Sequence, residues 1–188
     1  MMNNLQEQIK FKKVAASEIL ISELMLPSNS NFNGKIHGGY ILNLMDQIAF
    51  ACASKHSKTY CVTASVDTVD FLNPIEIGEL VTMKASINYV GNTSMVVGIR
   101  VEAENIRTGQ KKHCNSSYFT MVAKDEQGNS VAVPGLILTD KRQVRRFLEC
   151  LKRLEMKSQR RNEFEKKDFS PHDYMHILEG YKIKIALD

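Results

Sequence analysis

The chain of 188 residues has no tryptophan, only 4 prolines and 10 glycines, and no long apolar run. Because 43% of the residues are hydrophobic, this composition excludes a collagen-like or generally disordered chain. The densest apolar stretch, residues 40–53, is interrupted by polar side chains and is shorter than the roughly 20 apolar residues that cross a bilayer. We therefore expect one folded domain with an appendage and no membrane-spanning helix.

Cysteine is also scarce, and its placement excludes two kinds of site. The 4 cysteines lie far apart without a CxxC pair, which predicts neither a disulfide framework nor a zinc site. We expect reduced thiols, most of them buried, at Cys52, Cys61, Cys114 and Cys150. Residues 1–13 contain no apolar core typical of a secretory signal, so the cytoplasm is the expected compartment.

An excess of one charge is absent from most of the chain. Residues 1–138 carry 12 Lys and Arg against 12 Asp and Glu, whereas residues 139–188 carry 13 against 9, so the whole excess of +4 lies in the tail. This asymmetry places a boundary near residues 135–139. It predicts two parts, a domain of residues 1–138 and a basic helical extension of residues 139–188.

Four segments have the pattern of β-strands. Residues 60–72, 79–90, 94–106 and 112–124 are rich in Val, Ile, Thr, Tyr and Phe and are separated by short turn-like sequences. The two shortest turns can join antiparallel neighbours directly, which predicts a meander. Residues 17–26 are a further strand candidate, although their register stays open.

Residues 40–54 carry apolar side chains around nearly the whole helical circumference, which is typical of a buried helix. A narrow polar stripe is formed by Asn43, Asp46, Gln47 and Ser54. One buried helix lying across an antiparallel sheet of about five strands is a two-layer α+β architecture.

Beyond residue 139 the pattern predicts an amphipathic helix capped by Thr139 and Asp140, followed by a second short helix over residues 170–180. The apolar face of the first helix consists of Val144, Phe147, Leu148, Leu151 and Leu154. Two roles stay open for its basic face. It either speeds the capture of a negatively charged ligand, or solubilises a helix that packs on the core or a neighbouring subunit.

The segment best suited to chemistry is the Gly-rich loop of residues 31–39, which leads into the buried helix. The first N–H groups of a helix lack internal partners, so Gly38 and Gly39 would let an oxyanion approach them. Asp46 lies about two turns further along, where a carboxylate is costly unless it is paired or used as a base or nucleophile. The alternative is a plain tight turn followed by the solvent side of a helix.

Several motifs occur in a fixed order along the chain. They are Asn31-Phe-Asn-Gly34, His37-Gly38-Gly39, Leu42, Asp46, Phe71-Leu-Asn73-Pro74-Ile, Gly78-Glu79 and Val90-Gly-Asn-Thr-Ser94. In this order they resemble the motifs of hotdog-fold acyl-CoA thioesterases, most closely the branch that hydrolyses fatty acyl-CoA. The resemblance covers roughly residues 15–135. It implies a curled antiparallel sheet around a central helix, in agreement with the architecture predicted above.

The resemblance also implies a thioester hydrolase with a site at a dimer interface. Asn31 would come from one subunit and Asp46 from the other. The backbone N–H groups of His37, Gly38 and Gly39 would polarise the thioester carbonyl. Asp46 would either activate a water molecule or attack the carbonyl itself, and both routes stay open. Asn33 also precedes a glycine and competes with Asn31 for its role, although the spacing favours Asn31.

A place for coenzyme A follows from the same resemblance. The turn of Gly91, Asn92, Thr93 and Ser94 resembles the family's site for the pantetheine and phosphate part, and Asn73 is a further candidate for substrate binding. A plain hairpin turn is the alternative. We expect coenzyme A only as part of the substrate, with no separate cofactor and no metal. The expected partners are acyl-CoA and copies of this chain, with no nucleic acid and no membrane. The assembly is at least a dimer and, as in much of the family, a hexamer built as a trimer of dimers.

Two other functions stay open beside the leading hypothesis, hydrolysis of fatty acyl-CoA to fatty acid and CoA in fatty acid metabolism. An enoyl-CoA hydratase or dehydratase with His37 as base needs the same oxyanion site, but Asp46 occupies the thioesterase position. A non-catalytic acyl-CoA sensor would bind the same ligand and use the basic tail for nucleic acid, although the tail lacks a helix-turn-helix pattern.

Overall fold

The computed structural model describes residues 10–166 and 180–186 of the chain. In chain order its elements are β1 (Phe11–Lys13), the 3-10 turn η1 (Val14–Ala16), β2 (Ile19–Leu24), the 3-10 turn η2 (Pro27–Asn29), α1 (Gly38–Ser57), β3 (Tyr60–Val66), β4 (Glu79–Val90), β5 (Ser94–Asn105), β6 (Lys111–Lys124), β7 (Gly135–Ile137) and α2 (Lys141–Lys166).

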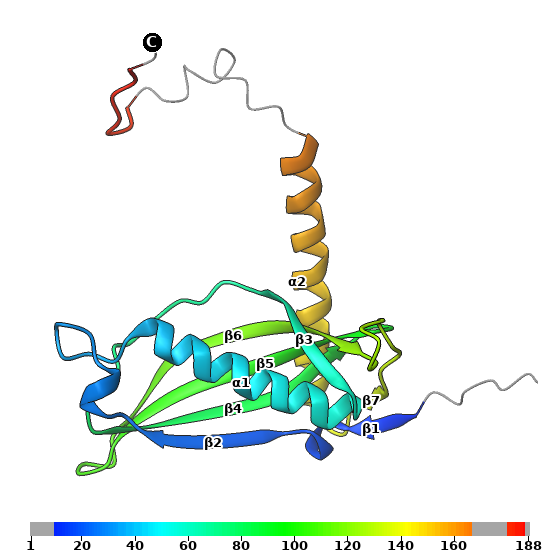
Figure 1. The fold of residues 1–188 in the computed structure, drawn as a ribbon, viewed down its shortest axis with the longest axis horizontal. Helices are drawn as coiled ribbons and strands as arrows, with labels where there is room; N and C mark the ends of the chain where they lie inside the picture. The colour runs from blue at the N-terminus through cyan, green and yellow to red at the C-terminus, as the bar shows by residue number, and fades with distance from the viewer. Residues whose placement is uncertain (1–9, 167–179, 187–188) are drawn as a thin grey trace, which may run out of the picture. The chain divides into compact units, whose positions relative to one another are not determined.

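Five strands form one antiparallel sheet in the order β2-β4-β5-β6-β3, and the sheet curls around α1 (Figure 1). The predicted meander is β4, β5 and β6, whose bounds differ from the predicted ranges by at most one residue. The uncertain early strand is β2, which pairs with β4 at one edge of the sheet. This α+β architecture is the hotdog fold expected from the sequence.

One apolar core lies between α1 and the sheet. Alternate residues of β4, among them Val81, Met83 and Ala85, are buried against the helix, so Thr82 and Lys84 point to the opposite face. The helix contributes its own apolar residues to the same core: Ile41, Leu44, Met45, Ile48, Ala49 and Cys52. Burying each large apolar side chain stabilises the fold by about 1.5–3 kcal/mol.

Helix α1 is longer than predicted at both ends. It starts at Gly38 and ends where Lys58 adopts the left-handed conformation, with φ of 66°, so that its N–H donates to the Ser54 carbonyl at 2.8 Å. Asn43, Asp46 and Gln47 are exposed, as the polar stripe predicted. Phe50 is also exposed on α1, whereas Ser54, predicted for the polar stripe, is only half-buried and its hydroxyl oxygen is buried.

The strand predicted over residues 60–72 stops at Val66. Beyond it, the chain still runs beside β6, because the Leu72 N–H donates to the Cys114 carbonyl at 2.9 Å. The Ser117 hydroxyl, however, bonds the carbonyls of Asp67 and Thr68 at 3.3 and 3.4 Å. A side chain therefore takes the acceptors that a regular strand would offer to its neighbour.

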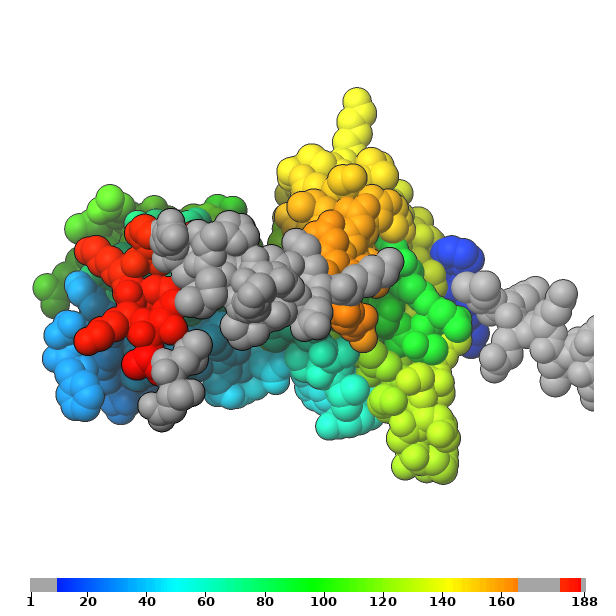
Figure 2. All heavy atoms as spheres, turned by 90° about the horizontal axis from the view of Figure 1, so that it is seen from above, coloured from blue at the N-terminus to red at the C-terminus, as the bar shows by residue number. Residues whose placement is uncertain are grey.

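A feature not predicted is a parallel pair of short strands, β1 and β7, which pairs Phe11 with Gly135 and Lys13 with Ile137 (Figure 1). In Figure 2 the blue start of the described chain lies against yellow-green residues from much later in the sequence. Buried His56 at the end of α1 lies beside it, with Nε2 2.9 Å from the Pro134 carbonyl and Nδ1 3.3 Å from Ser17 Oγ. Burial lowers the pKa of His56, so the imidazole is held neutral.

The chain divides into two compact units, residues 1–150 and 151–188. The first turns of α2 belong to the first unit: Phe147 packs on Tyr89 with ring centres 5.2 Å apart, and Cys150 is buried. The predicted cap is confirmed, since Asp140 Oδ1 accepts the N–H of Gln143 at 2.9 Å.

The apolar face predicted for this helix is only partly covered, because Val144 and Leu148 are exposed. The division predicted after residue 138 stays a prediction. The second tail helix, predicted over residues 170–180, lies almost wholly outside the described residues. In the described part of the chain, no helix is long and apolar enough to span a membrane.

Candidate active site

The loop before α1 is held by its own polar groups. Asn31 Oδ1 accepts the N–H groups of Asn33 at 3.0 Å and Lys35 at 3.1 Å, and the Asn31 carbonyl accepts the N–H of Gly34, which adopts a φ of 70°. Lys35 is tied to Glu76 by an ion pair of 2.5 Å. The Asn31 side chain is thus oriented, and its Nδ2 has no hydrogen-bond partner among residues 10–166. Asn33 contributes only its backbone N–H to this turn.

The amino-terminal end of α1 is open. The side chain of the N-cap residue, His37, does not cap it, and its first turn contains no acidic residue. The N–H of His37 donates to the Asn29 carbonyl at 2.9 Å. This bond engages the His37 amide, one of the three predicted oxyanion donors, and leaves the amides of Gly38 and Gly39, which bond to no backbone acceptor within the described ranges.

Glycine at position 38 is explained by a close neighbour. A Cβ there would lie 3.2 Å from the ring of Phe71, which arrives from the irregular segment after β3. Any side chain at Gly38 would therefore press on this ring or close the approach to the helix end. Gly39 is exposed and more loosely surrounded, with His37 Nδ1 3.8 Å from its Cβ position.

Asp46 is exposed on α1, and Thr63 of β3 donates a hydrogen bond from Oγ1 to Asp46 Oδ1 at 2.6 Å. This bond engages one carboxylate oxygen and fixes the side chain. Sequence reasoning did not find Thr63. A strand advances about 3.3 Å per residue against about 1.5 Å for a helix, so β3 passes back along the second half of α1 within a few residues. That spacing indicates the level of the contact but not the residue that makes it.

The predicted CoA-binding residues do not come together within one chain. The turn of residues 91–94 is closed by a bond of 2.8 Å from the Gly91 N–H to the Ser94 carbonyl, and the Asn92 and Thr93 carbonyls accept N–H groups of the segments that cover it. Ser94 pairs with Val122 of β6, which pairs in turn with Val62 near the start of β3. Because β3 follows α1 directly, the turn lies near the carboxyl end of α1.

Asn73 lies at the other end of the sheet, near the start of α1. Its Nδ2 donates to the His113 carbonyl at 2.8 Å, and the adjacent Ile75 carbonyl bonds the N–H of Ile36 in the loop before α1. Asn73 is therefore close to the predicted oxyanion end and far from the turn of residues 91–94.

Exposed aromatic residues lie beside Asp46. Phe50, one helical turn after Asp46, contacts Tyr60 of β3 in an edge arrangement with ring centres 5.6 Å apart. Tyr60 is 63% exposed and lies on β3, which is an edge strand of the sheet. An apolar edge of this kind is costly in water and is typical of an interface.

Other nucleophiles and metal sites can be assessed from the described residues. The four cysteines are buried as reduced thiols, and burial raises the pKa of Cys52 to about 12, so its thiol stays protonated. Tyr40, in the first turn of α1, donates to Glu23, and this bond raises the pKa of Tyr40. Within residues 10–166 and 180–186, no three His, Cys, Asp or Glu side chains cluster as metal ligands would.

Comparison with known sequences assigns the chain to a family. The profile of the thioesterase superfamily matches residues 33–110. The protein VdlD of Helicobacter pylori is 45% identical over 76% of this chain and 81% of its own length. The human cytosolic acyl coenzyme A thioester hydrolase is 33% identical over 81% of this chain, which spans only 41% of that protein.

Solved structures agree with these sequence matches. A hexameric acyl-CoA thioesterase superposes with a TM-score of 0.79 at 34% identity, covering 81% of this chain and 97% of that chain. An acyl-CoA hydrolase of Staphylococcus aureus, solved with butyryl coenzyme A and coenzyme A, gives 0.77 at 28% identity, covering 88% and 99%. The chain therefore belongs to the hotdog-fold acyl-CoA thioester hydrolases of the thioesterase superfamily.

Proposed function

We propose that this protein hydrolyses fatty acyl-CoA to a free fatty acid and CoA, at a site completed by a second copy of the chain. The observation that carries the proposal is the arrangement on α1, where Asp46 is exposed and held by Thr63 on a helix whose amino-terminal amides are uncapped. A fixed carboxylate and an open helix end are the base and the oxyanion site that thioester hydrolysis needs.

The distance along α1 is the reason for two copies. Asp46 is about 12 Å along the helix axis from Gly38, at about 1.5 Å per residue. One thioester carbon cannot lie within reach of both groups of the same helix. We infer that the amides of Gly38 and Gly39 in one subunit face Asp46 of the other, and that the exposed aromatic edge at Phe50 and Tyr60 is covered by this contact.

The reaction then follows from the placed groups. The carbonyl oxygen accepts hydrogen bonds from the two glycine amides, which lie at the positive end of the helix dipole. Asp46 removes a proton from water as the water oxygen attacks the carbonyl carbon. The C–S bond breaks, the acid leaves with the new oxygen, and the CoA sulfur receives the proton. Thr63 holds one oxygen of Asp46, and Asn31 Nδ2 orients the water or the carbonyl.

Direct attack by Asp46 is the other route, through an anhydride that water opens. A single turnover in water labelled with ¹⁸O separates the two. Attack by water puts the label into the fatty acid, whereas an anhydride opened at the Asp46 carbonyl puts it into the protein. Mass spectrometry of acid and peptide reads out both.

Names of related structures support the assignment of these residues. Structures of the S. aureus hydrolase include alanine variants of an asparagine, an aspartate and a threonine. Those three positions have the same separations along that chain as Asn31, Asp46 and Thr63 have here. The same hydrolase was solved with CoA, and other relatives are described as hexameric.

We extend the proposal to the remaining groups in the same way. Gly91, Asn92, Thr93 and Ser94 hold the pantetheine and phosphate part of CoA, and Asn73 supports the substrate near the helix end. The enzyme works in the cytosol as a hexamer, a trimer of dimers, with no cofactor besides the CoA of its substrate and no nucleic acid partner. Light scattering on the purified chain measures the assembly, and a monomer at micromolar concentration would contradict the shared site.

The central test follows CoA thiol release across a series of acyl-chain lengths. Asp46→Asn is expected to lower kcat/KM by about 10²- to 10⁴-fold, because it removes the base. Asn31→Ala and Thr63→Val are each expected to cost about tenfold or more, the value of a hydrogen bond to a charged or reacting group. Asp125→Asn, the same change in an exposed turn, is the control and is expected to leave the rate unchanged.

Two outcomes would replace the proposal. A wild-type protein that binds acyl-CoA but releases no thiol at any chain length would be an acyl-CoA sensor. Hydration of an enoyl-CoA without thiol release, abolished by His37→Ala, would indicate a hydratase.

A further inference from the structure

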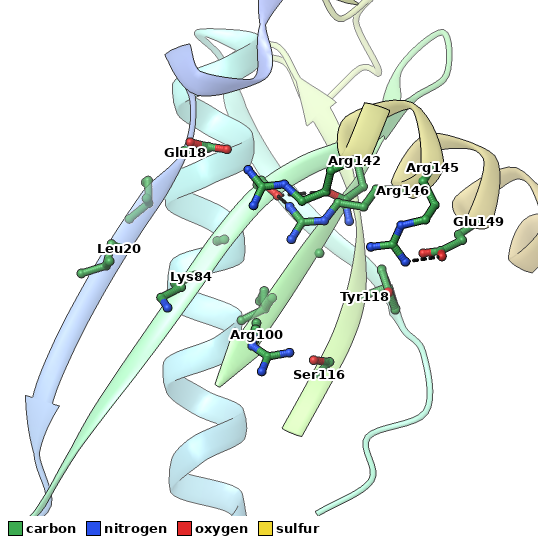
Figure 3. Close-up of a pocket in the computed structure, with 16 residues that line it drawn as sticks. Glu18, Leu20, Lys84, Arg100, Ser116, Tyr118, Arg142, Arg145, Arg146 and Glu149 are labelled. Atoms are coloured by element: carbon green, nitrogen blue, oxygen red, sulfur yellow. Dashed lines mark hydrogen bonds and ion pairs between the residues drawn. The ribbon is translucent and has the colours of Figure 1, made fainter. Parts of the chain in front are cut away.

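A second site is suggested on the face of the sheet that is turned away from α1. There, a polar cavity of about 500 Å³ lies between the sheet and the first turns of α2, with all its lining residues within residues 18–149 (Figure 3). Its floor consists of side chains that alternate with the core residues of β4 and β5. The sheet therefore separates this cavity from Asp46.

A β-bulge adds an amide group to this polar floor. Asn88 is the extra residue where β4 pairs with β5, and its side chain lies over Gly98. A Cβ at residue 98 would be 2.1 Å from Asn88 Nδ2, so only glycine leaves room for this amide. Ser86 donates to Asn88 Oδ1 at 3.0 Å, and both side chains are buried. With its oxygen engaged, Asn88 offers Nδ2 to the cavity as a donor.

Three of the cations that line the cavity already have acidic partners. Lys84 and Arg100 both bond to Glu102, at 2.6 and 2.8 Å, and these two bonds lower the pKa of Glu102 to about 2. Arg145 turns toward Glu149 on its own helix, at 2.9 Å (Figure 3). Two carboxylates therefore offset two of these three positive charges.

Arg142 and Arg146 are different. Both reach from α2 toward the sheet (Figure 3), and Arg146 Nη1 donates to the neutral Ser86 Oγ at 3.4 Å. Among the described residues no carboxylate bonds to either guanidinium, and Glu18 lines the same cavity without an ion pair to them. Two like charges that face one cavity repel each other, so an anion between them would lower the free energy of the site.

We propose that this cavity binds a phosphate group of a small ligand, with Arg142 and Arg146 as its cationic partners and Asn88 Nδ2 as a further donor. Guanidinium groups match phosphate oxygens in charge and in paired geometry. The phosphate is either a further phosphate of CoA, besides the part proposed for the turn of residues 91–94, which rests on the function proposed above, or belongs to a separate phosphorylated molecule, which does not.

Binding is tested with inorganic tripolyphosphate, titrated calorimetrically into the full chain at low salt. We expect one site per chain, and the pair Arg142→Gln with Arg146→Gln should weaken binding at least tenfold. Lys141→Gln is the matched control, because it removes an exposed charge of the same helix that does not line the cavity. It should change the affinity less than twofold. Arg142→Gln alone, at an exposed position, serves if the double variant does not fold.

Kinetics separates the two sources of phosphate. If CoA supplies it, the double variant should raise KM for butyryl-CoA about tenfold while kcat, and KM for phosphate-free butyryl-pantetheine, stay unchanged. If a separate molecule supplies it, both KM values should stay unchanged while tripolyphosphate binding is lost.

The phosphate site is wrong if wild type does not bind tripolyphosphate and both KM values are insensitive to the double variant. It is equally wrong if Lys141→Gln weakens binding as much as the double variant, since that result would indicate attraction by overall charge alone. The titration stands even if no thioesterase activity is found, so failure of the site and failure of the proposed function are distinguishable.

Discussion

The two faces of the five-stranded sheet are built by the same strands from opposite kinds of side chain. The face toward α1 buries large apolar residues such as Met83, Phe119 and Met121. The other face carries charged and hydroxyl groups such as Lys84, Arg100 and Ser116, and the first turns of α2 lie against part of it. The difference indicates that the first face stabilises the fold, while the second is free to carry charge.

The sharpest test compares neighbouring residues of β6 that point to opposite faces. Phe119→Ala, at a side chain 1% exposed, should lower the free energy of unfolding by about 3–5 kcal/mol, because it leaves a cavity in the core. Thr120→Ala, half-buried on the other face, should cost less than about 1 kcal/mol. Urea denaturation measures both, and equal losses would break the comparison.

The charged face also has one tightly packed position, where Asn88 of the β-bulge lies over Gly98. Gly98→Ala should cost about 1–3 kcal/mol, because its Cβ would lie 2.1 Å from Asn88 Nδ2 and the amide must move. In a chain that also carries Asn88→Ala, the same change should cost clearly less. Denaturation of the four members of this cycle gives the coupling. Additive losses would mean that the two residues do not compete for space.

Acid should destabilise the folded protein through the buried side chain of His56. Because burial lowers its folded-state pKa below the ordinary 6.5, the unfolded chain binds more protons, so stability is full above that value and is lost as the pH falls through the folded pKa. Thermal unfolding between pH 7.5 and 5 should show this slope. His56→Gln should cost about 1–3 kcal/mol at pH 7 and flatten the slope. Exposed His37→Gln should keep it.

The smallest effect is expected from the ion pairs of the charged face. Glu102→Gln should lower stability by about 0.5–1 kcal/mol at pH 7, because Lys84 and Arg100 are half-exposed and screened by solvent. The wild-type contribution should be present above the ordinary pKa of 4.5 and fade as the pH falls toward 2. A salt titration at pH 7 should shrink the difference between wild type and variant. An effect as large as that of Phe119→Ala would overturn the ranking of the faces.

Much of the sheet face toward α1, and of α1 itself, was predictable because the sequence patterns that indicate them are local. Alternation along β4 and β5 marks strand bounds to within a residue, and the all-round apolar pattern of residues 40–54 identifies the central helix. Strands β1 and β7 escaped prediction, since three residues show no period and the partners are far apart in the chain. On α2, apolar spacing alone did not show that Val144 and Leu148 remain exposed while Phe147 is packed.

The candidate site likewise has features that were predictable from the sequence and features that were not. The loop and helix start were predictable from the Gly-rich motif, and Asp46 from its cost on an apolar helix. The contact with Thr63 depends on how β3 crosses α1, and the bond from the His37 amide to the Asn29 carbonyl depends on how the loop before α1 folds back. The separation of Asn73 from the turn of residues 91–94 also depends on how distant backbone segments cross.

The pairing of β1 with β7 also bears on how the protein is made. Strand β1, the first of the described residues, finds its partner only at residues 135–137, after all five strands of the main sheet have been synthesised. On the ribosome, residues 11–13 must therefore wait until residues 135–137 have emerged. Pairing of these two short strands is a late step. A nascent chain halted before Gly135 would contain all five strands of the main sheet, while β1 would have no partner in β7.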